Sequence, residues 1–481
     1  MNIRLITAAL GALIALLGLC MLSSLFWSLH YQDGLYFRWA AVSVCAIAVG
    51  ACLFFALREP HTEFGARDAF VVVTGGWVTS GVLGAVPFMA CGVLPSFTDA
   101  IFESVSGFTT TGATVLADVE TVPRSVLFWR SLTHWLGGMG IIVLSVAILP
   151  LLGVGGMAMF KAEVPSPVVD KLKPTVAATA KALWKVYLIL SAAETLLLVL
   201  AGMELFDAIC HTFGTLATGG FSTKNLSIGH YESPLIHLII IVFMLMAGVN
   251  FTLHYQAMNL NFSSYGRSQE FRLYLIIFLG STAFIFWNIY RLPNGALFAS
   301  LDQAAFQTAS IMTTTGYGTA DWEQWPWACQ WLLLSLMFMG GCAGSTGGGM
   351  KCMRLVIVAK HILRELKLLL HPRAVIALKM DRAVVHNSIV NGILAFAALF
   401  VAVWSLSTAL LVAMDLDVIT AVGATTATLS NIGPGLNKVG AMDHYGWLSQ
   451  PAKWLLSFNM LIGRLELFTV LILFVPDFWK K

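Results

Sequence analysis

Four short loops that combine threonine or asparagine with glycine recur along the chain at near-even spacing. Backbone carbonyl oxygens can replace the water shell of a potassium ion when the chain turns so that they point at one axis, and glycine permits such turns. The third loop, Thr314–Gly318, reads TTGYG and differs by one residue from the filter sequence TVGYG. The pattern predicts a cation filter formed by Thr110, Thr111, Gly112, Thr218, Gly219, Thr314, Thr315, Gly316, Asn431, Ile432 and Gly433.

Each loop follows a short amphipathic stretch that opens with an aspartate. These stretches are too short to cross a bilayer and predict half-helices that enter the membrane and turn back, which is tolerated only inside protein or along a water-filled cavity. We expect the aspartates to cap the half-helices, whose negative dipole ends would converge on the cation. The aspartates are Asp99, Asp207, Asp302 and Asp417, and the glycines aligned behind them are Gly112, Gly219, Gly316 and Gly433, separated by 107, 97 and 117 residues.

A glycine-rich stretch, GGCAGSTGGG at residues 340–349, interrupts an apolar run after the third loop. Glycine costs a helix roughly 1 kcal/mol relative to alanine, so this segment predicts a break that lines the cavity below the filter and obstructs it as a gate. The alternative is a close helix-packing surface. The gating candidates are Gly344, Ser345, Thr346, Gly347 and Gly348.

Arg464 lies in the middle of the last apolar run. A charge at that depth costs about 2.5–3.5 kcal/mol on insertion scales, so its side chain should face the bundle interior, where it would repel cations below the filter. A salt bridge to Glu466 or to the mid-span Glu194 is the alternative. For His134, His211 and His254 we expect buried, hydrogen-bonded rings and no metal site.

The elements that must position these residues are membrane-spanning helices. Of 481 residues, 58% are hydrophobic and 11% charged, against about 25% charged in soluble domains. Ten apolar runs are each about long enough to cross the hydrocarbon core as a helix. The fold class is therefore all-α integral membrane, with spans at 5–27, 39–57, 69–93, 125–153, 183–202, 235–253, 271–289, 327–343, 389–414 and 453–475.

The charged segments between the runs differ from one side to the other. Segments 57–68, 153–185, 262–272 and 351–382 hold 17 Lys or Arg against 8 Asp or Glu, while the alternate segments hold 5 against 13. The positive-inside rule makes the first set, and both termini, cytoplasmic. Because the basic residues flank spans, membrane topology explains them better than nucleic acid does. The sequence near Gly153-x-Gly155-x-x-Ala158 lacks the context of a dinucleotide-binding unit, so no organic cofactor is expected.

With its four loops, two preceding spans, the run KLKPTVAATAKALW (171–184) and the glycine-rich stretch, the chain resembles the TrkH-like membrane subunits of the Trk/Ktr/HKT superfamily. The resemblance implies four pseudo-symmetric span–pore helix–span repeats around a central pore. It predicts two extra helices at 1–60 and repeats at 61–160, 161–262, 263–380 and 381–481. In that family one glycine per filter marks potassium preference, and an arginine matching Arg464 contacts the gating loop.

The resemblance also implies the activity: potassium uptake across a bacterial inner membrane, with K⁺ as the transported ion. A sodium-permeable or unselective member of the superfamily is the alternative, and both passive and proton-coupled transport stay open. An enzyme is not expected, since no catalytic constellation is present. The implied partners are a second copy of the chain, membrane lipid and a cytosolic TrkA-type subunit that binds NAD, ATP or ADP.

Overall fold

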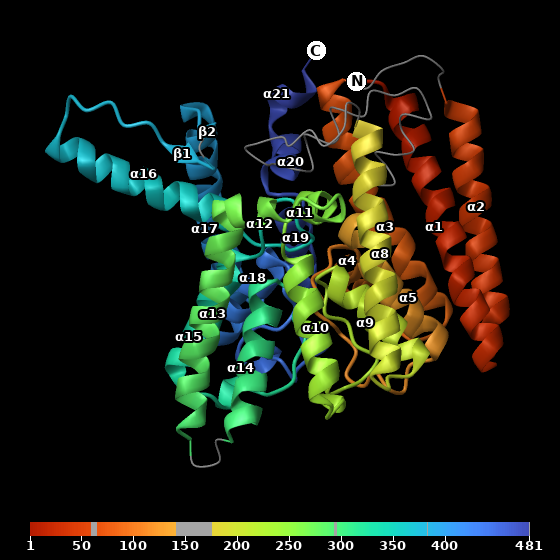
Figure 1. Cartoon of the computed structure of the whole chain (residues 1–481). Coiled ribbons are helices and arrows are strands. Elements are labelled where there is room, and N and C mark those ends of the chain that lie inside the picture. The colour runs from red at the N-terminus through yellow and green to blue at the C-terminus, as the bar shows by residue number, and fades with distance from the viewer. Residues whose placement is uncertain (59–64, 141–175, 293–295, 382, 481) are drawn as a thin grey trace.

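The structure is a helical bundle in which one order of elements recurs four times (Figure 1). A computed structural model describes residues 1–58, 65–140, 176–292, 296–381 and 383–480. In each recurrence a long helix is followed by a short helix, a loop with left-handed residues and a further helix. This order supports the predicted repeats, whose exact boundaries stay a prediction. The 160/161 boundary, the Gly153–Ala158 motif, residues 141–153 of the 125–153 span and the start of the 171–184 run lie outside the described residues.

The first two recurrences follow the N-terminal pair α1 (Ile3–Tyr31) and α2 (Tyr36–Leu57). In the first, α3 (Ala66–Ala90) leads to the short α4 (Phe97–Phe108), then to α5 (Arg124–Trp135) and the π-helical turn η1 (Leu136–Gly140). In the second, α8 (Val176–Leu200) leads to α9 (Leu205–Leu216), the turn η2 (Ser227–His230), α10 (Pro234–Ala247) and α11 (Phe251–Met258). The small helix α12 (Ser263–Arg267) closes this part.

The last two recurrences contain several additional short elements besides their long and short helices. The third has α13 (Gln269–Tyr290), α14 (Leu297–Met312), η3 (Trp322–Gln324), α15 (Trp327–Met339) and α16 (Cys352–Leu370). A two-residue hairpin, β1 (Lys379–Met380) with β2 (Ala383–Val384), follows α16. The fourth has α17 (Asn387–Ala413), α18 (Val418–Ser430), η4 (Asn437–Val439) and α19 (Gln450–Arg464), and ends in α20 (Phe468–Leu471), η5 (Ile472–Phe474) and α21 (Pro476–Trp479).

Continuous spans are fewer than the ten predicted. Within the described residues, six helices are long and apolar enough to cross a membrane, and eight if each of two bent pairs counts as one span. The predicted run 235–253 turns by 103° between α10 and α11, and the run 453–475 turns by 109° after α19. The second turn passes through Glu466 and Leu467, both with left-handed φ (56° and 47°). Hydrophobicity alone cannot reveal these bends, because both arms of each bent pair are apolar.

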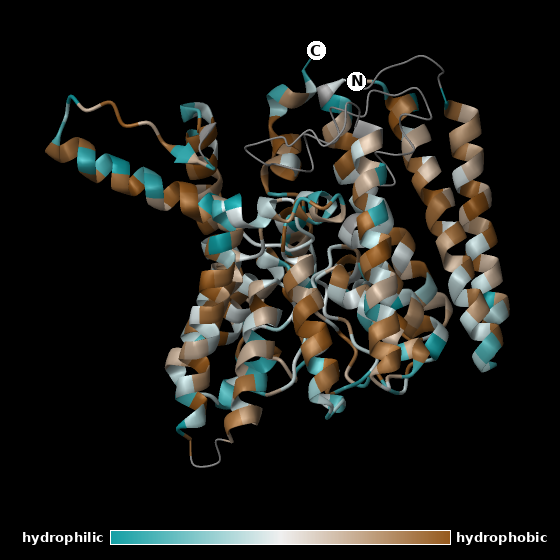
Figure 2. Ribbon diagram, in the orientation of Figure 1, coloured by the Kyte–Doolittle hydropathy of each residue, from teal (hydrophilic) through white to brown (hydrophobic). Residues whose placement is uncertain are grey.

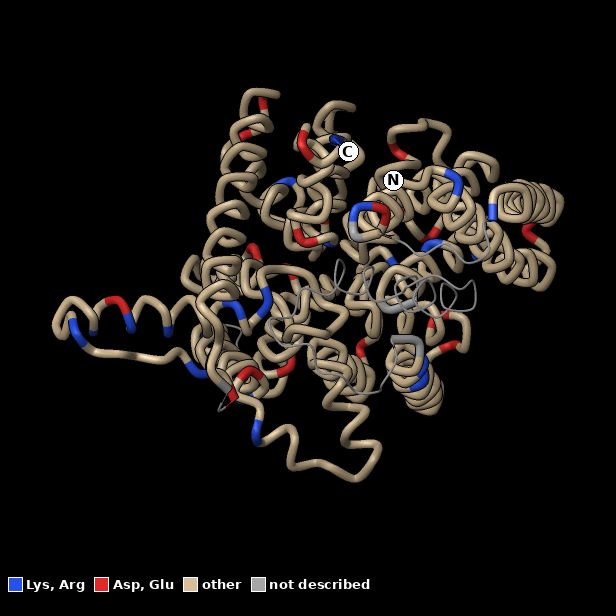
Figure 3. Tube along the Cα trace, turned by 90° about the horizontal axis from the view of Figure 1, so that it is seen from above, with Lys and Arg blue, Asp and Glu red and all other residues tan. Residues whose placement is uncertain are grey.

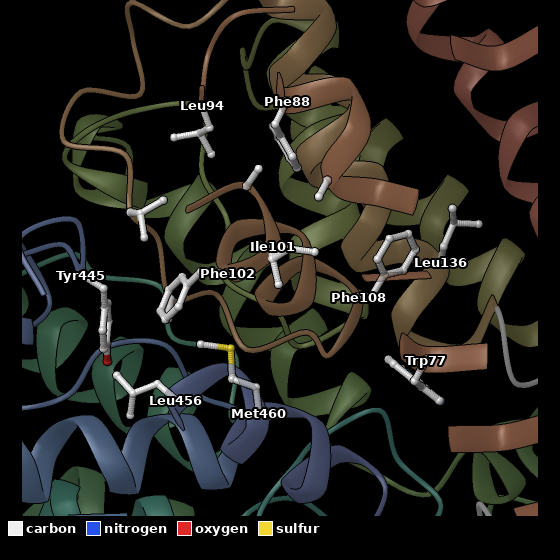
Figure 4. Close-up of a cluster of buried hydrophobic side chains, with 14 of the residues drawn as sticks. Trp77, Phe88, Leu94, Ile101, Phe102, Phe108, Leu136, Tyr445, Leu456 and Met460 are labelled. Carbon is white, nitrogen blue, oxygen red and sulfur yellow. The ribbon is translucent and has the colours of Figure 1, made fainter. Parts of the chain in front are cut away.

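The short helices lie inside the bundle. Figure 4 shows α4 surrounded by side chains from α3 and α19, among them Phe88, Leu456 and Met460. Ala100, Phe102 and Ser104 of α4 are all completely buried. Because every backbone group of a re-entrant helix must be kept away from lipid, this enclosure is what allows α4 to end at mid-bundle. Helix α4 is thus buried in protein, as predicted for a half-helix.

The outer helices show the opposite pattern, because they expose large hydrophobic side chains such as Phe26, Phe37 and Phe55. Figure 2 shows the hydrophobic residues along their ribbons in brown. Helices α1 and α2 pack along each other at one edge. Their contact is close because a Cβ atom on Gly50 would lie 2.3 Å from the backbone nitrogen of Ala15. Helix α16 projects from the bundle at the end where both termini lie (Figures 1 and 3), and carries Lys360, Arg364 and Lys367 along its length.

Candidate functional site

Each short helix ends in the same backbone arrangement. In the first loop the N–H of Thr110 donates to the carbonyl oxygen of Gly107 (3.0 Å), and the N–H of Thr111 donates to that of Ser106 (2.9 Å). These bonds define a Schellman motif, in which the helix closes on a left-handed residue. Equivalent bonds end the other three short helices, and the left-handed residues are Thr110 (φ 52°), Thr218 (54°), Thr314 (63°) and Asn431 (56°).

Threonine in this position is unusual. A β-branched residue with positive φ is a conformational outlier, and such strain costs about 1–3 kcal/mol and persists only where the surrounding structure imposes it. Three of the four loops carry it at the same point. Recurrent strain at equivalent positions favours a functional reason over a chance turn.

A second left-handed residue follows two positions later in every loop, and here the sequence-based alignment is wrong at one point. The residues are Gly112 (φ 83°), Gly220 (80°), Gly316 (82°) and Gly433 (94°). Gly219, aligned by sequence with the other three, instead takes the middle position together with Thr111, Thr315 and Ile432. The TGG sequence offers two adjacent glycines, so pattern alone could not choose between them. Gly220 was therefore missed.

These glycines bring the four loops into a closed ring. A Cβ atom on Gly112 would lie 2.0 Å from the carbonyl oxygen of Gly219 in the second loop, and one on Gly220 would lie 2.0 Å from that of Thr315 in the third. The remaining two contacts close the circle: from Gly316 to the Ile432 oxygen (1.9 Å) and from Gly433 to the Thr111 oxygen (2.7 Å). Each loop thus meets the next through backbone atoms, with no room for a side chain.

The ring leaves carbonyl oxygens available as ligands. In the described part of the chain, the N–H groups of the middle residues donate to carbonyl oxygens of the short helices, and their own carbonyl oxygens accept no hydrogen bond. Uncommitted carbonyl oxygens are hard, neutral ligands suited to an alkali cation. The middle residues are Thr111, Gly219, Thr315 and Ile432.

Only one aspartate caps its short helix as predicted. Asp417 is the N-cap of α18 and accepts from the N–H of Thr420 (2.9 Å), a bond that holds its carboxyl pKa below the usual value. Ser96 and Glu204 occupy the N-cap positions of α4 and α9, so Asp99 and Asp207 fall in the first turn. Asp302 lies further into α14 and pairs with His237 (Oδ2–Nδ1 2.7 Å). The cap prediction is wrong for these three, although the first-turn carboxylates still face the positive helix end.

The glycine-rich segment lies against the ends of the short helices. The Thr346 hydroxyl donates to the carbonyl oxygen of Leu216 at the end of α9 (2.9 Å). The N–H of Gly348 donates to the Thr314 hydroxyl of the third loop (2.7 Å), and a Cβ atom on Gly348 would lie 2.2 Å from the carbonyl oxygen of Ser430, which ends α18. The segment therefore lies beneath the ring and contacts the second, third and fourth of the four recurrences, at the ends of their short helices or in their loops.

Other gating candidates shape the segment itself. Gly344 has φ +74°, and its carbonyl oxygen accepts from the N–H of Phe251 (3.1 Å). Ser345 donates its hydroxyl proton to the carbonyl oxygen of Cys342 (2.6 Å). Gly347 accepts from the Lys351 ammonium, a cation that sequence reasoning did not select.

Arg464 connects the glycine-rich segment to η1 of the first recurrence. Its guanidinium donates to the carbonyl oxygen of Thr346 (2.7 Å) and to those of Gly137 (3.0 Å) and Gly138 (3.1 Å) in η1. The contact with the glycine-rich segment is as the resemblance implied. Glu466, the salt-bridge alternative, pairs with Arg354 instead.

A model of the TrkH family, described as cation transport protein, matches residues 37–481. The chain belongs to the TrkH family. It is 41% identical to the Trk system potassium uptake protein TrkH of Salmonella typhimurium and 42% identical to that of Vibrio parahaemolyticus, each over the full length of both chains. The crystal structure of the potassium transporter TrkH from Vibrio parahaemolyticus superposes with a TM-score of 0.90 at 40% identity and covers both chains completely. The resemblance and the fold class are confirmed: this TrkH-family chain is an integral membrane transport protein and not an enzyme.

The buried histidines of this TrkH-family chain are largely paired, as expected. His211 bonds to the carbonyl oxygen of Asp207 (2.8 Å) and to Ser222 (2.9 Å), and His254 bonds to Tyr265 (2.7 Å) and to the carbonyl oxygen of Met246 (2.8 Å). His134 accepts the N–H of Phe221 at Nδ1 (3.4 Å), and its Nε2 has no hydrogen-bond partner among the described residues. No group of acidic, histidine and cysteine side chains in the described ranges could hold a metal ion.

Two tyrosines that hold the loops in this TrkH-family fold were also missed from sequence. The Tyr317 hydroxyl donates to the carbonyl oxygen of His211 (2.9 Å), which ties the third loop to α9. The Tyr445 hydroxyl donates to the carbonyl oxygen of Gly433 in the fourth loop (2.7 Å). Tyr317 stands in the TTGYG motif, which was a usable signal; Tyr445 lies in an ordinary connecting segment and offered none.

Proposed function

We propose that this chain takes up potassium across a bacterial inner membrane through the ring of carbonyl oxygens. The observation that carries the proposal is the closure of the ring, in which each loop's glycine meets the next loop's carbonyl oxygen in the order one, two, three, four, one. The loops meet through backbone atoms, and carbonyl oxygens gathered in this way suit a partly dehydrated monovalent cation. The named relatives are potassium uptake proteins, which supports K⁺ over Na⁺ as the ion.

We further propose that the glycine-rich segment and Arg464 are the gate. The segment lies beneath the ring, and a guanidinium held there adds an electrostatic barrier to a cation leaving the filter. Glycines at 344 and 349 have left-handed φ, so the segment can change its path at residues that tolerate many conformations. Opening needs the Thr346 and Gly348 bonds to be broken.

Control of the gate would come from outside the chain. Both termini and the basic helix α16 lie toward one end of the molecule, which supports a cytoplasmic face there (Figure 1). On that face we place a cytosolic TrkA-type subunit that binds NAD, ATP or ADP, with the chain itself a homodimer and α16 close to anionic lipid. The relatives named above are parts of Trk systems, which supports a multi-component assembly.

The test is ion flux in liposomes that contain the purified chain. Potassium-loaded vesicles with rubidium tracer outside should accumulate tracer, and external K⁺ should compete far better than external Na⁺. A pH gradient imposed on the same vesicles distinguishes proton-coupled from passive transport. Equal competition by the two ions would contradict the potassium assignment and support the sodium-permeable alternative.

A further inference from the structure

A fully buried ion pair lies immediately behind the ring, between the first and second loops. Nε of Arg130 in α5 lies 2.6 Å from Oε1 of Glu103 in α4, and the two side chains are 3% and 0% exposed. Breaking such a pair leaves an uncompensated charge in the protein interior, so both partners are held in one arrangement. The ion pair therefore holds these two side chains in fixed positions next to the filter loops.

Glu103 reaches the first loop. Its carboxylate accepts from the hydroxyl of Thr114 (2.9 Å) and from the N–H of Val115 (2.9 Å), two and three residues after Gly112. The exit of the first loop is thus bonded to the short helix that precedes it.

Arg130 reaches the second loop. Its Nη1 donates to the carbonyl oxygen of Ser222 (2.9 Å), two residues after Gly220. The guanidinium carbon also lies 3.5 Å from the ring centroid of Phe221, a cation–π contact that is strong when desolvated.

His134 adds a second contact from the same helix. Residues four apart lie on the same face of a helix, so Arg130 and His134 both face Phe221 of the second loop. The His134 imidazole stacks on Phe221 (centroids 4.0 Å apart, planes 14° apart), while its Nδ1 accepts the Phe221 N–H (3.4 Å). A Cβ atom on Gly219 would lie 2.3 Å from His134 Nδ1, so the imidazole also occupies the space behind the middle position of that loop.

We propose that the Glu103–Arg130 pair, together with His134, sets the spacing between the first and second filter loops and thereby determines ion selectivity. The inference rests on the proposed function, since selectivity has meaning only if the ring conducts. The same spacing governs the close fit of the two loops, in which a Cβ atom on Gly112 would lie 2.0 Å from the Gly219 oxygen. Loops three and four have tyrosine supports of their own: Tyr317 ties the third loop to α9, and Tyr445 bonds to Gly433 of the fourth. These are positioning residues, because they act on the ion through the loops.

The experiment compares Glu103→Gln and Arg130→Lys with wild type in liposomes, measuring sodium flux and potassium flux separately. Glu103→Gln keeps an acceptor oxygen but removes the charge, and Arg130→Lys keeps the charge but removes the planar fork that serves both partners. We expect the Na⁺/K⁺ flux ratio to rise about tenfold in each, the lower end of what loss of a supporting group costs a metal site.

The matched control is Arg124→Gln. Arg124 stands at the start of the same helix and also pairs with a glutamate, Glu204 (2.5 Å), but that pair is 40% and 49% exposed. Its loss should leave the flux ratio at the wild-type value. If a charge-altering variant does not accumulate in the membrane, Phe221→Leu repeats the test, because it removes the stacked ring without stranding a buried charge.

The outcomes separate the two claims. A wild-type protein that passes Na⁺ as readily as K⁺ overturns the proposed function. A potassium-selective wild type whose variants lose both fluxes in proportion, with a lower melting temperature and an unchanged ratio, overturns the positioning role and leaves only a structural one. A raised ratio in every one of these variants that accumulates in the membrane, and not in Arg124→Gln, establishes the inference.

Discussion

The two adjacent glycines of the second loop give the sharpest test of the ring. Gly220 has φ +80°, and a Cβ atom there would lie 2.0 Å from the backbone oxygen of Thr315. Since real Cβ atoms stay at least 3.0 Å from such atoms, the oxygen must move by about 1.0 Å (3.0 − 2.0). An L side chain in left-handed backbone costs a further 1–2 kcal/mol or so. A shift of the second loop away from the third relieves both the contact with the Thr315 oxygen and the strain at residue 220, and this shift widens the ring.

For Gly219 the same change acts on a side chain and not directly on the backbone of the ring. Its φ lies outside the left-handed range, and the atom that a Cβ would meet, at 2.3 Å, belongs to the His134 side chain and not to backbone. We therefore expect Gly220→Ala to lower the K⁺/Na⁺ flux ratio by roughly 5- to 30-fold, the equivalent of about 1–2 kcal/mol, and Gly219→Ala to lower it less. Gly280→Ala, where a Cβ meets nothing within 4 Å, is the control.

Competition of Na⁺ and K⁺ for rubidium tracer uptake in liposomes measures this ratio directly. A larger loss of selectivity in Gly219→Ala than in Gly220→Ala would refute the register of the ring. Loss of uptake in the Gly280→Ala control would show that the assay reports folding and not selectivity.

The gate and one helix cap give three further tests. Deleting residues 344–348 should raise potassium flux without any partner subunit, and no rise in liposomes would count against a gate there. Arg464→Gln should also raise flux, because it removes charge-assisted bonds worth about 1.5–3 kcal/mol each; flux at or below the wild-type level would contradict the barrier. Asp417→Ala should destabilise α18 by about 1 kcal/mol, seen as a lower melting temperature. Because the folded pKa of Asp417 is lowered, wild type should lose the same stabilisation as the pH falls through that pKa, whereas the variant should show no such step.

Much of the fold could be predicted from the sequence, because the preference of each segment for lipid or water decides where it lies. Long apolar runs, basic segments on alternate sides and four related loops led to spans, short half-helices and a pore. That Arg464 faces the bundle interior also followed from a local property, the cost of a charge at membrane depth. Its contact with the glycine-rich segment was implied by the family resemblance and not by the residue alone.

The remaining features depend on contacts between distant parts of the chain. The choice of Gly220 over Gly219 is decided by the third loop, whose Thr315 oxygen leaves no room for a side chain. Asp302 looked like a cap but pairs with His237 on another helix, and α14 begins five residues earlier. The Glu103–Arg130 pair joins two helices through side chains that, in sequence, stand in unremarkable surroundings. No local pattern encodes such pairings.

A ring closed by four stretches of one polypeptide has a consequence for how its permeation can change. In a channel assembled from identical subunits, one codon alters every side of the passage at once. Here a substitution enters a single loop and directly displaces only the loop that it contacts, so the response of the ring is graded. All four loops are always present together because they belong to one polypeptide. Each loop can therefore have its own supporting side chains, an ion pair for the first and second loops and tyrosine hydroxyls for the third and fourth.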